Sequence, residues 1–547
     1  MEALIPVPVV LPLLAAGLKL AIGRKLVRLQ ALISVGTLAV VLLVSLLLLP
    51  AADRQGPLVA HAGGWGAPIG ITLVADRLST LMLAVSSAVT LCVMVYSLAQ
   101  SRADQEHRAP LSIFHPAYLI MVAGVSDAFL SGDLFNLFVG FEMLLSGSYV
   151  LLTFGGTEAR IRAGATYTVV GLASSLLFLV AIAVAYAATG TVSMAQLAER
   201  FSVLPQHIRL LVELTLLLVF VVKAAIFPMS AWLPDSYPTA PAPATALFAG
   251  LLTKVGIYSI IRLEALLFPG GPVSGLLMWA ALLTMLVGVF GAVAQTDIKR
   301  MLSFTLVSHI GYMVFGVALF TVAGMAGAIF YVAHHITVQT SLFLVTGLIE
   351  RRTGTTSLNR LGGLAGAAPA IAVLFFVPAM NLAGIPPMSG FLGKLGLIQA
   401  GVADGRPMAL ALVAGGLLTS LLTLYAVATT WNRAFWGTSA APAPETTAEG
   451  GAAREGGEGE PGAAGTEKTG EAGDDGGGAG NTGGITGKAV VTAVTMPAPM
   501  LAATAALVVL ALSYTVLAGP LSALAERAAG ELLAREPYVS AVLGGER

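Results

Sequence analysis

Runs of about 20 apolar residues recur along the whole chain, and they constrain its fold more than any other feature. The hydrocarbon core of a bilayer is about 30 Å thick, a distance that an apolar α-helix of about 20 residues spans. With 56% hydrophobic and only 11% charged residues, the chain is too apolar for a water-soluble protein. The sequence therefore predicts an all-α polytopic membrane protein whose first apolar run is a transmembrane helix and not a cleaved signal. About 14 such segments are expected, with centres near Leu13, Val40, Ala84, Met121, Leu144, Phe178, Leu217, Ala249, Leu283, Val314, Leu342, Val377, Leu417 and Val508.

The positive charges between these segments predict how the chain is oriented in the membrane. The even-numbered loops carry only scattered cations, whereas Lys and Arg gather in the odd-numbered loops. Because positively charged short loops stay in the cytoplasm, we expect cytoplasmic odd loops and both termini outside. The cations of the odd loops are Arg24, Lys25, Arg28, Arg102, Arg108, Arg160, Arg162, Lys299, Arg300, Arg351, Arg352 and Arg360.

Prolines should break the helices of the seventh and twelfth segments. Pro228 and Pro234 lie in the seventh segment, and Pro386 and Pro387 lie in the twelfth. Each break carries a similar hexapeptide, PMSAWL in one and PMSGFL in the other. Since the two segments are offset by five positions along the chain, an odd number, the copies must have opposite topology. Paired broken helices in inverted repeats are typical of ion-coupled transporters, which bind their ions near the bilayer midplane.

The expected organisation has five parts. Residues 1–110 form the first three helices, residues 111–265 a first five-helix repeat, and residues 272–436 a second one. Residues 437–487 are rich in Gly and acidic residues, which predicts a disordered cytoplasmic loop that is either a partner-binding tether or an inert insertion. Residues 488–547 form helix 14 and then, from Leu521 to Glu536, a mixed apolar and charged segment, which is expected to lie as a short helix at the outer surface of the membrane.

Several classes of function lack any support in the sequence. The net charge is zero, so there is no basic surface for nucleic acid, and the single Cys92 excludes an intrachain disulfide. No Cys/His cluster suggests a metal site, and no cysteine set or Gly-rich phosphate loop suggests an iron–sulfur cluster, a flavin or a nucleotide. We therefore expect neither cofactor nor metal, and no bond chemistry by this chain alone.

Charged residues inside the apolar segments are the candidates for function, because a buried charge in a membrane is costly and is usually kept for an ion path. Glu142 lies in FNLFVGFEMLLSG and Lys223 in LLLVFVVKAAIFP. The two are predicted to form an intramembrane ion pair, which either conducts protons or holds two helices together as a static bridge. Further titratable groups continue the row and favour conduction.

Those further groups are Lys254, His334, His335 and Lys394. Buried lysine and histidine both suit a proton relay near neutral pH. Since neighbours on a helix point about 100° apart, we expect only one of the two histidines to face the path. Alternatively, the histidines bond to a neighbouring helix and Lys394 extends to the membrane surface.

Six residues are secondary candidates. Asp127 and Asp133 are expected at a pathway mouth, and Asp235 is expected to cap the resumed seventh helix. Lys299 is either a cytoplasmic anchor or a residue that leads protons in, and His309 follows it on the same helix. Gln339, one turn after the histidines, is the sixth. Arg262 and Glu264 are interpreted as membrane-interface residues.

Four motifs of the chain resemble one known family. They are FNLFVGFE, VVKAAIFPMSAWLPDSYPTAPAPATALFAGLLTKVGIY, DIKRMLSFTLVSHIGYM and NLAGIPPMSGFLGK, and they cover segments four to twelve. They are similar to the antiporter-like subunits shared by respiratory complex I and the multisubunit Mrp-type Na+/H+ antiporters. The stretches SYVLLTFGG, GTVSMAQLAER and IERRTGTTSLNRLGGL are most similar to D subunits of the Mrp antiporters.

The resemblance implies 14 transmembrane helices with two inverted five-helix repeats and broken helices seven and twelve. It also implies a bacterial cell membrane, partner membrane subunits, and transport of H+ in exchange for Na+. One position departs from the family, because Gln339 stands where a lysine is common, and Gln339 cannot titrate. Glu142 and Lys223 match the family's glutamate–lysine pair, Lys254 its central relay lysine, His334 and His335 its histidine region, and Lys394 its exit lysine.

Three functions remain open on the sequence. The first is a proton-conducting subunit of a monovalent cation/proton antiporter. The second is the equivalent subunit of a redox-driven pump, of the complex I or membrane-bound hydrogenase type, whose redox chemistry lies in other chains. The third is a structural subunit that conducts nothing, which the row of buried titratable groups disfavours.

Overall fold

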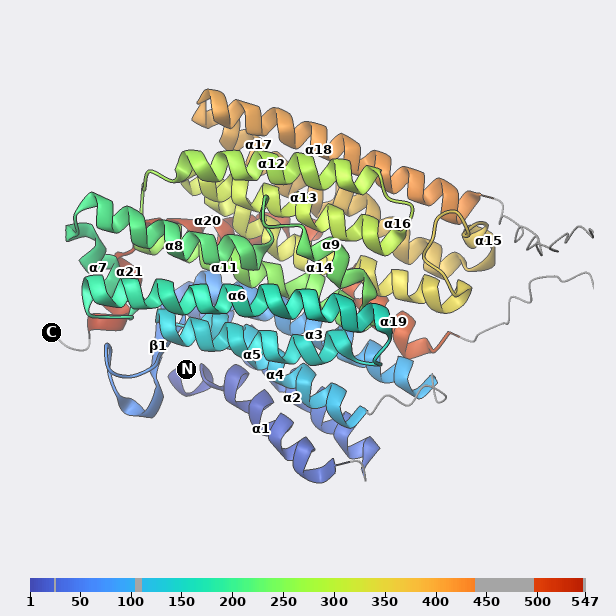
Figure 1. Cartoon of the computed structure of the whole chain (residues 1–547), viewed down its shortest axis with the longest axis horizontal. Coiled ribbons are helices and arrows are strands. Elements are labelled where there is room, and N and C mark those ends of the chain that lie inside the picture. Colours follow the sequence, from blue (N-terminus) through green and yellow to red (C-terminus); the bar gives the residue numbers. More distant parts are fainter. Residues whose placement is uncertain (24–25, 104–110, 438–495, 545–547) are drawn as a thin grey trace, which may run out of the picture.

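A computed structural model shows long helices packed side by side along one common direction (Figure 1). It describes residues 1–23, 26–103, 111–437 and 496–544, so most of the predicted acidic loop lies outside the described residues. The long helices and their short connecting helices are α1 Val7–Ile22, α2 Val27–Gln55, α3 Arg77–Ala103, α4 Leu111–Leu130, α5 Leu134–Thr153, α6 Glu158–Thr189, α7 Met194–Arg200, α8 Gln206–Ala224, α9 Trp232–Ser236, α10 Ala242–Leu247, α11 Thr253–Arg262, α12 Ser274–Val293, α13 Ile298–Leu319, α14 Val322–Thr353, α15 Leu364–Ala367, α16 Pro369–Ala383, α17 Ser389–Asp404, α18 Pro407–Trp431, α19 Ala498–Val516, α20 Ala518–Ala534 and α21 Glu536–Leu543.

The predicted all-α class has one small exception. β1 Leu58–His61 and β2 Thr72–Ala75 form an antiparallel two-stranded sheet between α2 and α3. Short 3₁₀ turns occur at η1 Glu2–Leu4, η3 Ala62–Gly64, η4 Phe201–Val203 and η5 Tyr237–Thr239. Wider π-helical turns occur at η6 Phe248–Leu252, η7 Leu263–Leu267 and η8 Asn432–Trp436. The fold is therefore nearly, not wholly, helical.

Twelve stretches of the described chain are long and apolar enough to cross a membrane. The two predicted segments missing from these twelve are the seventh, α8, and the twelfth, made of α16 and α17. These are the segments that were predicted to be broken. The total of 14 crossings and the boundaries of the two repeats stay predictions.

The chain leaves its helical path in both of these segments. α8 ends at Ala224 and the chain resumes at α9, whereas α16 ends at Ala383 and the chain resumes at α17. Pro228, Pro386 and Pro387 lie in these gaps, whereas Pro234 lies within α9. Backbone N–H groups freed by each gap donate to hydroxyls of other helices. Phe227 donates to Thr284 Oγ1 at 3.0 Å and Ser389 to Thr515 Oγ1 at 2.9 Å, as breaks inside a membrane require.

A two-residue backbone bridge occurs twice with the same geometry. Asp133 pairs with Ser193, and Asp297 pairs with Ser357. Each aspartate also accepts a hydrogen bond at the start of its helix, from Asn136 N at 2.6 Å and from Arg300 N at 3.1 Å. The first bridge precedes α7 and the second precedes α15, and these two helices lie at opposite ends of the bundle (Figure 1). This arrangement supports the predicted inverted repeats. Below, the two ends are called the α7 end and the α15 end.

The segment 521–536 was predicted to lie on the outer surface, and the structure corrects this. The hydroxyls of Tyr514, near the end of α19, and Thr337, midway along α14, lie 3.0 Å apart. α20 continues from there towards the α7 end and packs against α14. Its residues Leu524, Ala525, Ala528, Ala529 and Leu532 are buried. Small apolar side chains on one face of this helix therefore pack within the bundle, and α19 and α20 together cover the length of α14.

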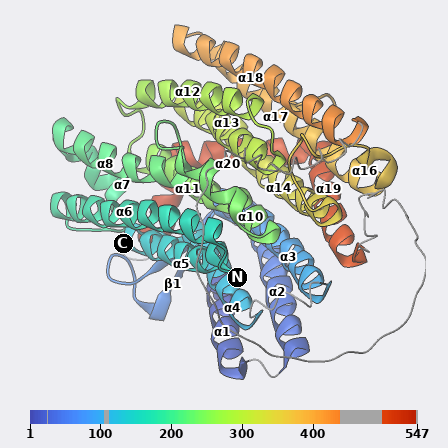
Figure 2. The same ribbon diagram turned by 45° about the vertical axis from the view of Figure 1, so that its right-hand side comes forward.

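α14 runs through the middle of the bundle (Figure 2). α1 and α2 lie at one edge and α18 at the other. The most apolar part of α14 is fully enclosed by neighbouring helices. Polar residues on α14 therefore face protein on every side, which is where a proton path shielded from lipid would lie.

Close packing of α4 on α5 depends on glycine, which gives a stability prediction. A side-chain carbon at Gly147 would lie 2.6 Å from the carbonyl oxygen of Ala117 and 2.8 Å from Met121 Cβ. Gly147→Val should therefore lower the free energy of unfolding by about 1–3 kcal/mol through overpacking. Thermal melting of the purified complex measures this. Gly36→Val on α2, where nothing lies within 4 Å, is the matched control, and equal melting of both variants would contradict the prediction.

Candidate functional site

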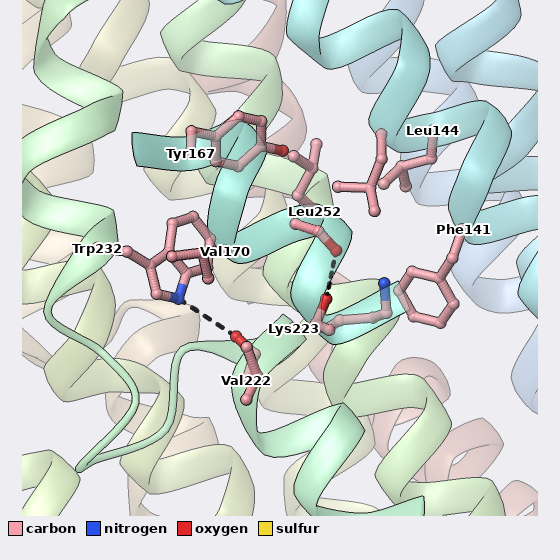
Figure 3. Close-up of a pocket in the computed structure, with 11 residues that line it drawn as sticks. Phe141, Leu144, Tyr167, Val170, Val222, Lys223, Trp232 and Leu252 are labelled. Carbon is pink, nitrogen blue, oxygen red and sulfur yellow. Dashed lines mark hydrogen bonds between the residues drawn. The ribbon is translucent and has the colours of Figure 1, made fainter. Parts of the chain in front are cut away.

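Glu142 and Lys223 are linked through a serine and do not form the predicted direct ion pair. Ser175 on α6 donates a short hydrogen bond to Glu142 Oε1, and Lys223 Nζ donates to Ser175 Oγ at 3.3 Å. Lys223 Nζ also lies 4.8 Å from the centre of the Phe141 ring (Figure 3). The serine was missed because a hydroxyl inside an apolar helix gives no signal of its own. The link joins α5, α6 and α8.

A small cavity beside Lys223 is large enough for a water molecule. Its volume is about 30 Å³, and Tyr167, Val222 and Trp232 are among the side chains that enclose it (Figure 3). A cavity of this size with polar groups in its wall holds about one water. Trp232 Nε1 donates to the carbonyl oxygen of Val222 at 3.3 Å and so fixes the start of α9 against the end of α8. The helix break thus leaves room for water next to the lysine.

Removing the bridging hydroxyl tests this link. Ser175→Ala should lower proton movement about tenfold, because a hydrogen bond to a charged group contributes about 1.5–3 kcal/mol and 1.4 kcal/mol is a factor of ten. Ser174→Ala is the control, since the Ser174 hydroxyl donates to the Gly171 carbonyl at 2.9 Å and bonds to neither charge. The measurement is proton flux in vesicles. Equal proton flux in wild type and Ser175→Ala would show that the Ser175 hydroxyl takes no part in proton movement.

Lys254 lies at the centre of the bundle and is fully buried. It follows the wide turn η6, and its Nζ donates to the carbonyl oxygen of Ala249 at 2.5 Å. η6 and α10 pack against α14. Among the described residues no carboxylate lies within 4 Å of this amine. A buried amine without a fixed counter-charge can take up or release a proton without first breaking an ion pair.

Both adjacent histidines belong to one aromatic cluster, whereas the sequence predicts that only one of them faces a path. His334 Nδ1 and Ser389 Oγ lie 3.0 Å apart, whereas the His335 ring lies 5.2 Å from the His309 ring. Tyr331 connects the two sides, because its hydroxyl is 2.8 Å from His309 Nδ1 and its ring is 5.4 Å from His334. The two histidines point in different directions, but both directions lead into the cluster.

Several ring nitrogens of this cluster have no hydrogen-bond partner among the described residues. These are His309 Nε2, His334 Nε2 and both nitrogens of His335. Unpartnered polar atoms in a buried site usually mark water, a proton or a ligand. His309, a secondary candidate by sequence, is thus a central member of the cluster. Tyr331 was missed because a tyrosine in an apolar helix is more often an ordinary core residue.

Lys394 does not extend to the membrane surface. Its side chain is buried, and Nζ donates to the carbonyl oxygens of Leu382 and Ala383, each at 3.0 Å. These carbonyls end α16, where the helix dipole favours a cation. Gly384 follows with φ of +88°, and a side-chain carbon there would lie 3.1 Å from Lys394 Cδ. The break in the helix therefore makes the binding place for the ammonium group, 5.1 Å from the Tyr312 ring.

Charged residues at the α15 end surround an open pocket of about 320 Å³. Lys299 Nζ lies 2.7 Å from Glu350 Oε2, and an Arg300 nitrogen lies 2.9 Å from Asp235 Oδ1. Asp235 is exposed and does not cap α9, because the start of α9 has no side-chain cap. The sequence could not show this, since the partner arginine lies in a distant segment.

Asp127 and Asp133 both lie near the α7 end, at the α4–α5 corner. Asn136 Nδ2 donates to Asp127 Oδ1 at 3.0 Å, while Asp133 caps α5. Asp127 Oδ2 has no partner among the described residues and faces Gly140. Gln339 on α14 donates to the Leu302 carbonyl at 2.8 Å, and its Oε1 is unpartnered in the same sense. None of these three bonds directly to the lysines or histidines above.

Arg262 and Glu264 were interpreted as interface residues, but both side chains are buried. Arg262 is 2.5 Å from Asp76 Oδ2 and lies between the rings of Tyr258 and Tyr538, 5.2 Å from each centre. Asp76 and Tyr538 are distant in sequence, so no local pattern predicts the pair. The described residues contain no group of three or more His, Cys, Asp or Glu side chains that could hold a metal ion.

Comparisons with known proteins place this geometry in context. Residues 131–423 match the family described as "NADH:quinone oxidoreductase/Mrp antiporter, TM". The D subunit of the Na+/H+ antiporter from Alkalihalophilus pseudofirmus is 41% identical over 440 residues, which cover 80% of this chain and 88% of that protein. The solved Mrp complex from Dietzia sp. DQ12-45-1b contains a chain 31% identical, with a TM-score of 0.84 and full coverage of both chains. Respiratory complex I from Thermus thermophilus contains a chain of the same fold, at 24% identity, a TM-score of 0.73, and coverage of 97% and 99%.

Proposed function

Because the chain belongs to the family of antiporter-like membrane subunits shared by NADH:quinone oxidoreductases and Mrp antiporters, we propose that it is the proton-conducting D-type subunit of a multisubunit Na+/H+ antiporter. Its relatives at 34–41% identity are named as antiporter subunits. The ions are H+ through this chain and Na+ exchanged by the assembled complex. The partners are other membrane subunits, in a bacterial cell membrane.

One observation carries the proposal, namely a row of titratable side chains through the bundle, all buried except the half-buried Glu142. The row begins at Glu142, Ser175 and Lys223, passes Lys254, continues through the histidine cluster, and ends at Lys394. Among the described residues no carboxylate lies within 4 Å of any of the three lysines. Charge on one member changes how readily its neighbour holds a proton. Protons therefore move along the row by successive transfers, with water filling the gaps.

The pocket at the α15 end offers water an approach towards this row. The pocket at the α15 end is lined by Pro234 and Asp235, which belong to the broken seventh segment. The predicted orientation places this end in the cytoplasm, because Arg300, Arg351 and Arg352 lie there. Acidic and basic side chains around the opening supply groups that exchange protons with bulk water. We therefore assign the pocket as the cytoplasmic entrance.

Transport by the assembled complex tests the function. Inverted vesicles that contain the complex are given a proton gradient, and Na+-dependent proton movement is followed with a pH-sensitive dye. Lys254→Met should lower it at least about 100-fold, since a positioned proton-transfer group contributes about 10²–10⁴-fold. Partner pull-down shows assembly. Unchanged transport by an assembled Lys254→Met complex would favour a scaffold role.

The redox-driven alternative has weaker support. The complex I chain shares the fold, but an identity of 24% supports a common fold and not a common function. Subunits that purify with this chain separate the two functions: small antiporter subunits support the proposal, and flavin or iron–sulfur subunits support the alternative.

A further inference from the structure

Two glutamates near the α7 end are buried without partners, and the proton row does not use them. Glu213 lies on α8 with 0% of its surface exposed, and Glu264 lies on η7 with 3% exposed. Both oxygens of Glu213 and Oε1 of Glu264 have no hydrogen-bond partner among the described residues. Within the same residues neither carboxyl forms an ion pair within 4 Å.

The two carboxyls belong to neighbouring elements. α8 packs directly against η7, which brings the two glutamates to one level of the bundle. Gly271, in the loop before α12, lies against the Glu213 carboxyl, where a side-chain carbon would be 3.0 Å from Oε2. The loop thus closes over Glu213 and leaves no space for a larger residue.

The cations nearby are held by other groups. Arg209, one turn before Glu213, donates to the Pro269 carbonyl at 3.4 Å and lies 5.9 Å from the Phe268 ring centre. Arg535 donates to the Ala198 carbonyl. Arg262, two residues before Glu264, pairs with Asp76. Arg209 is thus the nearest cation to Glu213, but no cation among the described residues forms an ion pair within 4 Å with either glutamate.

A buried carboxylate with neither donor nor counter-ion is very costly, and two that interact cannot both carry a charge cheaply. We propose that Glu213 and Glu264 form a proton-binding site, distinct from the lysine–histidine row, at the α7 end of the first repeat. The ligand is a proton, held on a carboxyl oxygen of the pair. It is taken from water at that end and returned to water or passed inward, and only O–H bonds form and break.

An apolar layer separates this site from the row. Glu213 lies ten residues from Lys223 on α8, and Glu264 lies ten residues from Lys254, which is about 15 Å along each helix. Leu216, Leu217, Val219 and Phe220 are buried between the two levels of α8. This inference rests on the proposed function. In it, the site exchanges protons with water on the α7 side of the membrane, and a proton crosses the apolar layer only when water enters that layer.

The experiment uses the complete complex and two readouts. Infrared difference spectra between wild type and variants report the carbonyl stretch of a protonated carboxyl group, and vesicles report Na+-dependent proton movement. Glu213→Gln and Glu264→Gln keep the shape of the neutral acid, so both should assemble. Each should remove protonated-carboxyl signal and lower proton movement at least threefold. Glu199→Gln, on an exposed residue of α7, should do neither.

The outcomes separate this site from the proposed function. Spectra unchanged in both glutamine variants would overturn the site, even if Lys254→Met abolishes transport. Failure of Glu213→Gln to assemble while Glu213→Asp assembles would show that the pair needs a charge, and would also overturn it. If Glu213→Gln and Glu264→Gln lose the protonated-carboxyl signal while Lys254→Met transports normally, the proton-binding site is supported and the proposed function is overturned.

Discussion

Lys223→Ala should abolish Na+-dependent proton movement while leaving the complex assembled. The variant removes the amine at which the link from Glu142 through Ser175 meets the break in the seventh segment. Apolar surroundings offer no substitute: the Phe141 ring and the small cavity beside Lys223 contain no other group that titrates near neutral pH. A loss of at least about 100-fold is expected, as for other positioned proton-transfer groups. The measurement is dye quenching in inverted vesicles with the wild-type complex alongside.

Glu142→Gln should also abolish Na+-dependent proton movement, in this case by removing the acidic group of the link. Glutamine keeps the oxygen that accepts from Ser175 but can no longer carry a negative charge or a proton. The fold should therefore survive and the transport should not. Partner pull-down checks assembly in both variants.

Matched control variants separate a specific role of Lys223 and Glu142 from a general cost of losing a charged residue. Lys19 is another buried lysine, bonded to Ser34 and outside the row, and Lys19→Ala should leave transport within about twofold of wild type. Glu158→Gln changes an exposed glutamate at the start of α6 and should be silent. If Lys19→Ala abolishes transport as well, the effect of Lys223→Ala is a general cost of losing a buried amine. If assembled Lys223→Ala transports normally, conduction through this subunit is wrong.

Removing a histidine at the centre of the cluster should lower transport as strongly as removing Lys223. His335→Ala and His309→Ala each delete a ring whose unpartnered nitrogens can bind and release a proton. We expect at least about 100-fold loss for each, and a double variant no worse than the stronger single one, because the two rings act in series. The same vesicle assay measures both.

Tyr331→Phe distinguishes conduction from packing in this cluster. It removes only the hydroxyl 2.8 Å from His309 Nδ1 and keeps the ring. A relay through the hydroxyl predicts a clear loss of transport with unchanged melting, whereas a packing role of the ring alone predicts that transport and melting both stay as in wild type. His207→Ala, at an exposed site at the start of α8, is the histidine control. Normal transport in His309→Ala would remove His309 from the path.

The sequence was informative wherever a single residue carries an unusual cost. Lysines in apolar helices and prolines in membrane segments are each locally unfavourable. For that reason Lys223, Lys254 and Lys394 could be singled out from the sequence, and the structure shows all three buried. The two breaks could be placed for the same reason. The glutamate–lysine link was predicted in its members but not in its form, because the bridging Ser175 comes from a third helix.

What the sequence could not supply depends on distant contacts. Asp235 was predicted to cap a helix, but it pairs with Arg300 from a distant segment. Arg262 and Glu264 were interpreted as membrane-interface residues from their place at a segment end, but both side chains are buried. Glu213 was missed although it lies only four residues from Leu217, the predicted centre of the seventh segment, where a charge is costly. The segment 521–536 was misplaced because its mixed polarity matches both a surface helix and one packed on small side chains.

The covering of α14 by α19 and α20 has a consequence for how the protein is made. α14 ends at Thr353, whereas α19 begins at Ala498, an interval that takes on the order of 10–30 s at ordinary rates of synthesis. Before α19 is made, the Thr337 hydroxyl lacks its hydrogen bond with Tyr514, and the backbone N–H of Ser389 lacks its hydrogen bond to Thr515. Until α19 and α20 have been synthesised, α14 therefore lacks the two helices that cover it. A truncated product would expose polar atoms to lipid, a feature that membrane quality control could use to recognise and remove it.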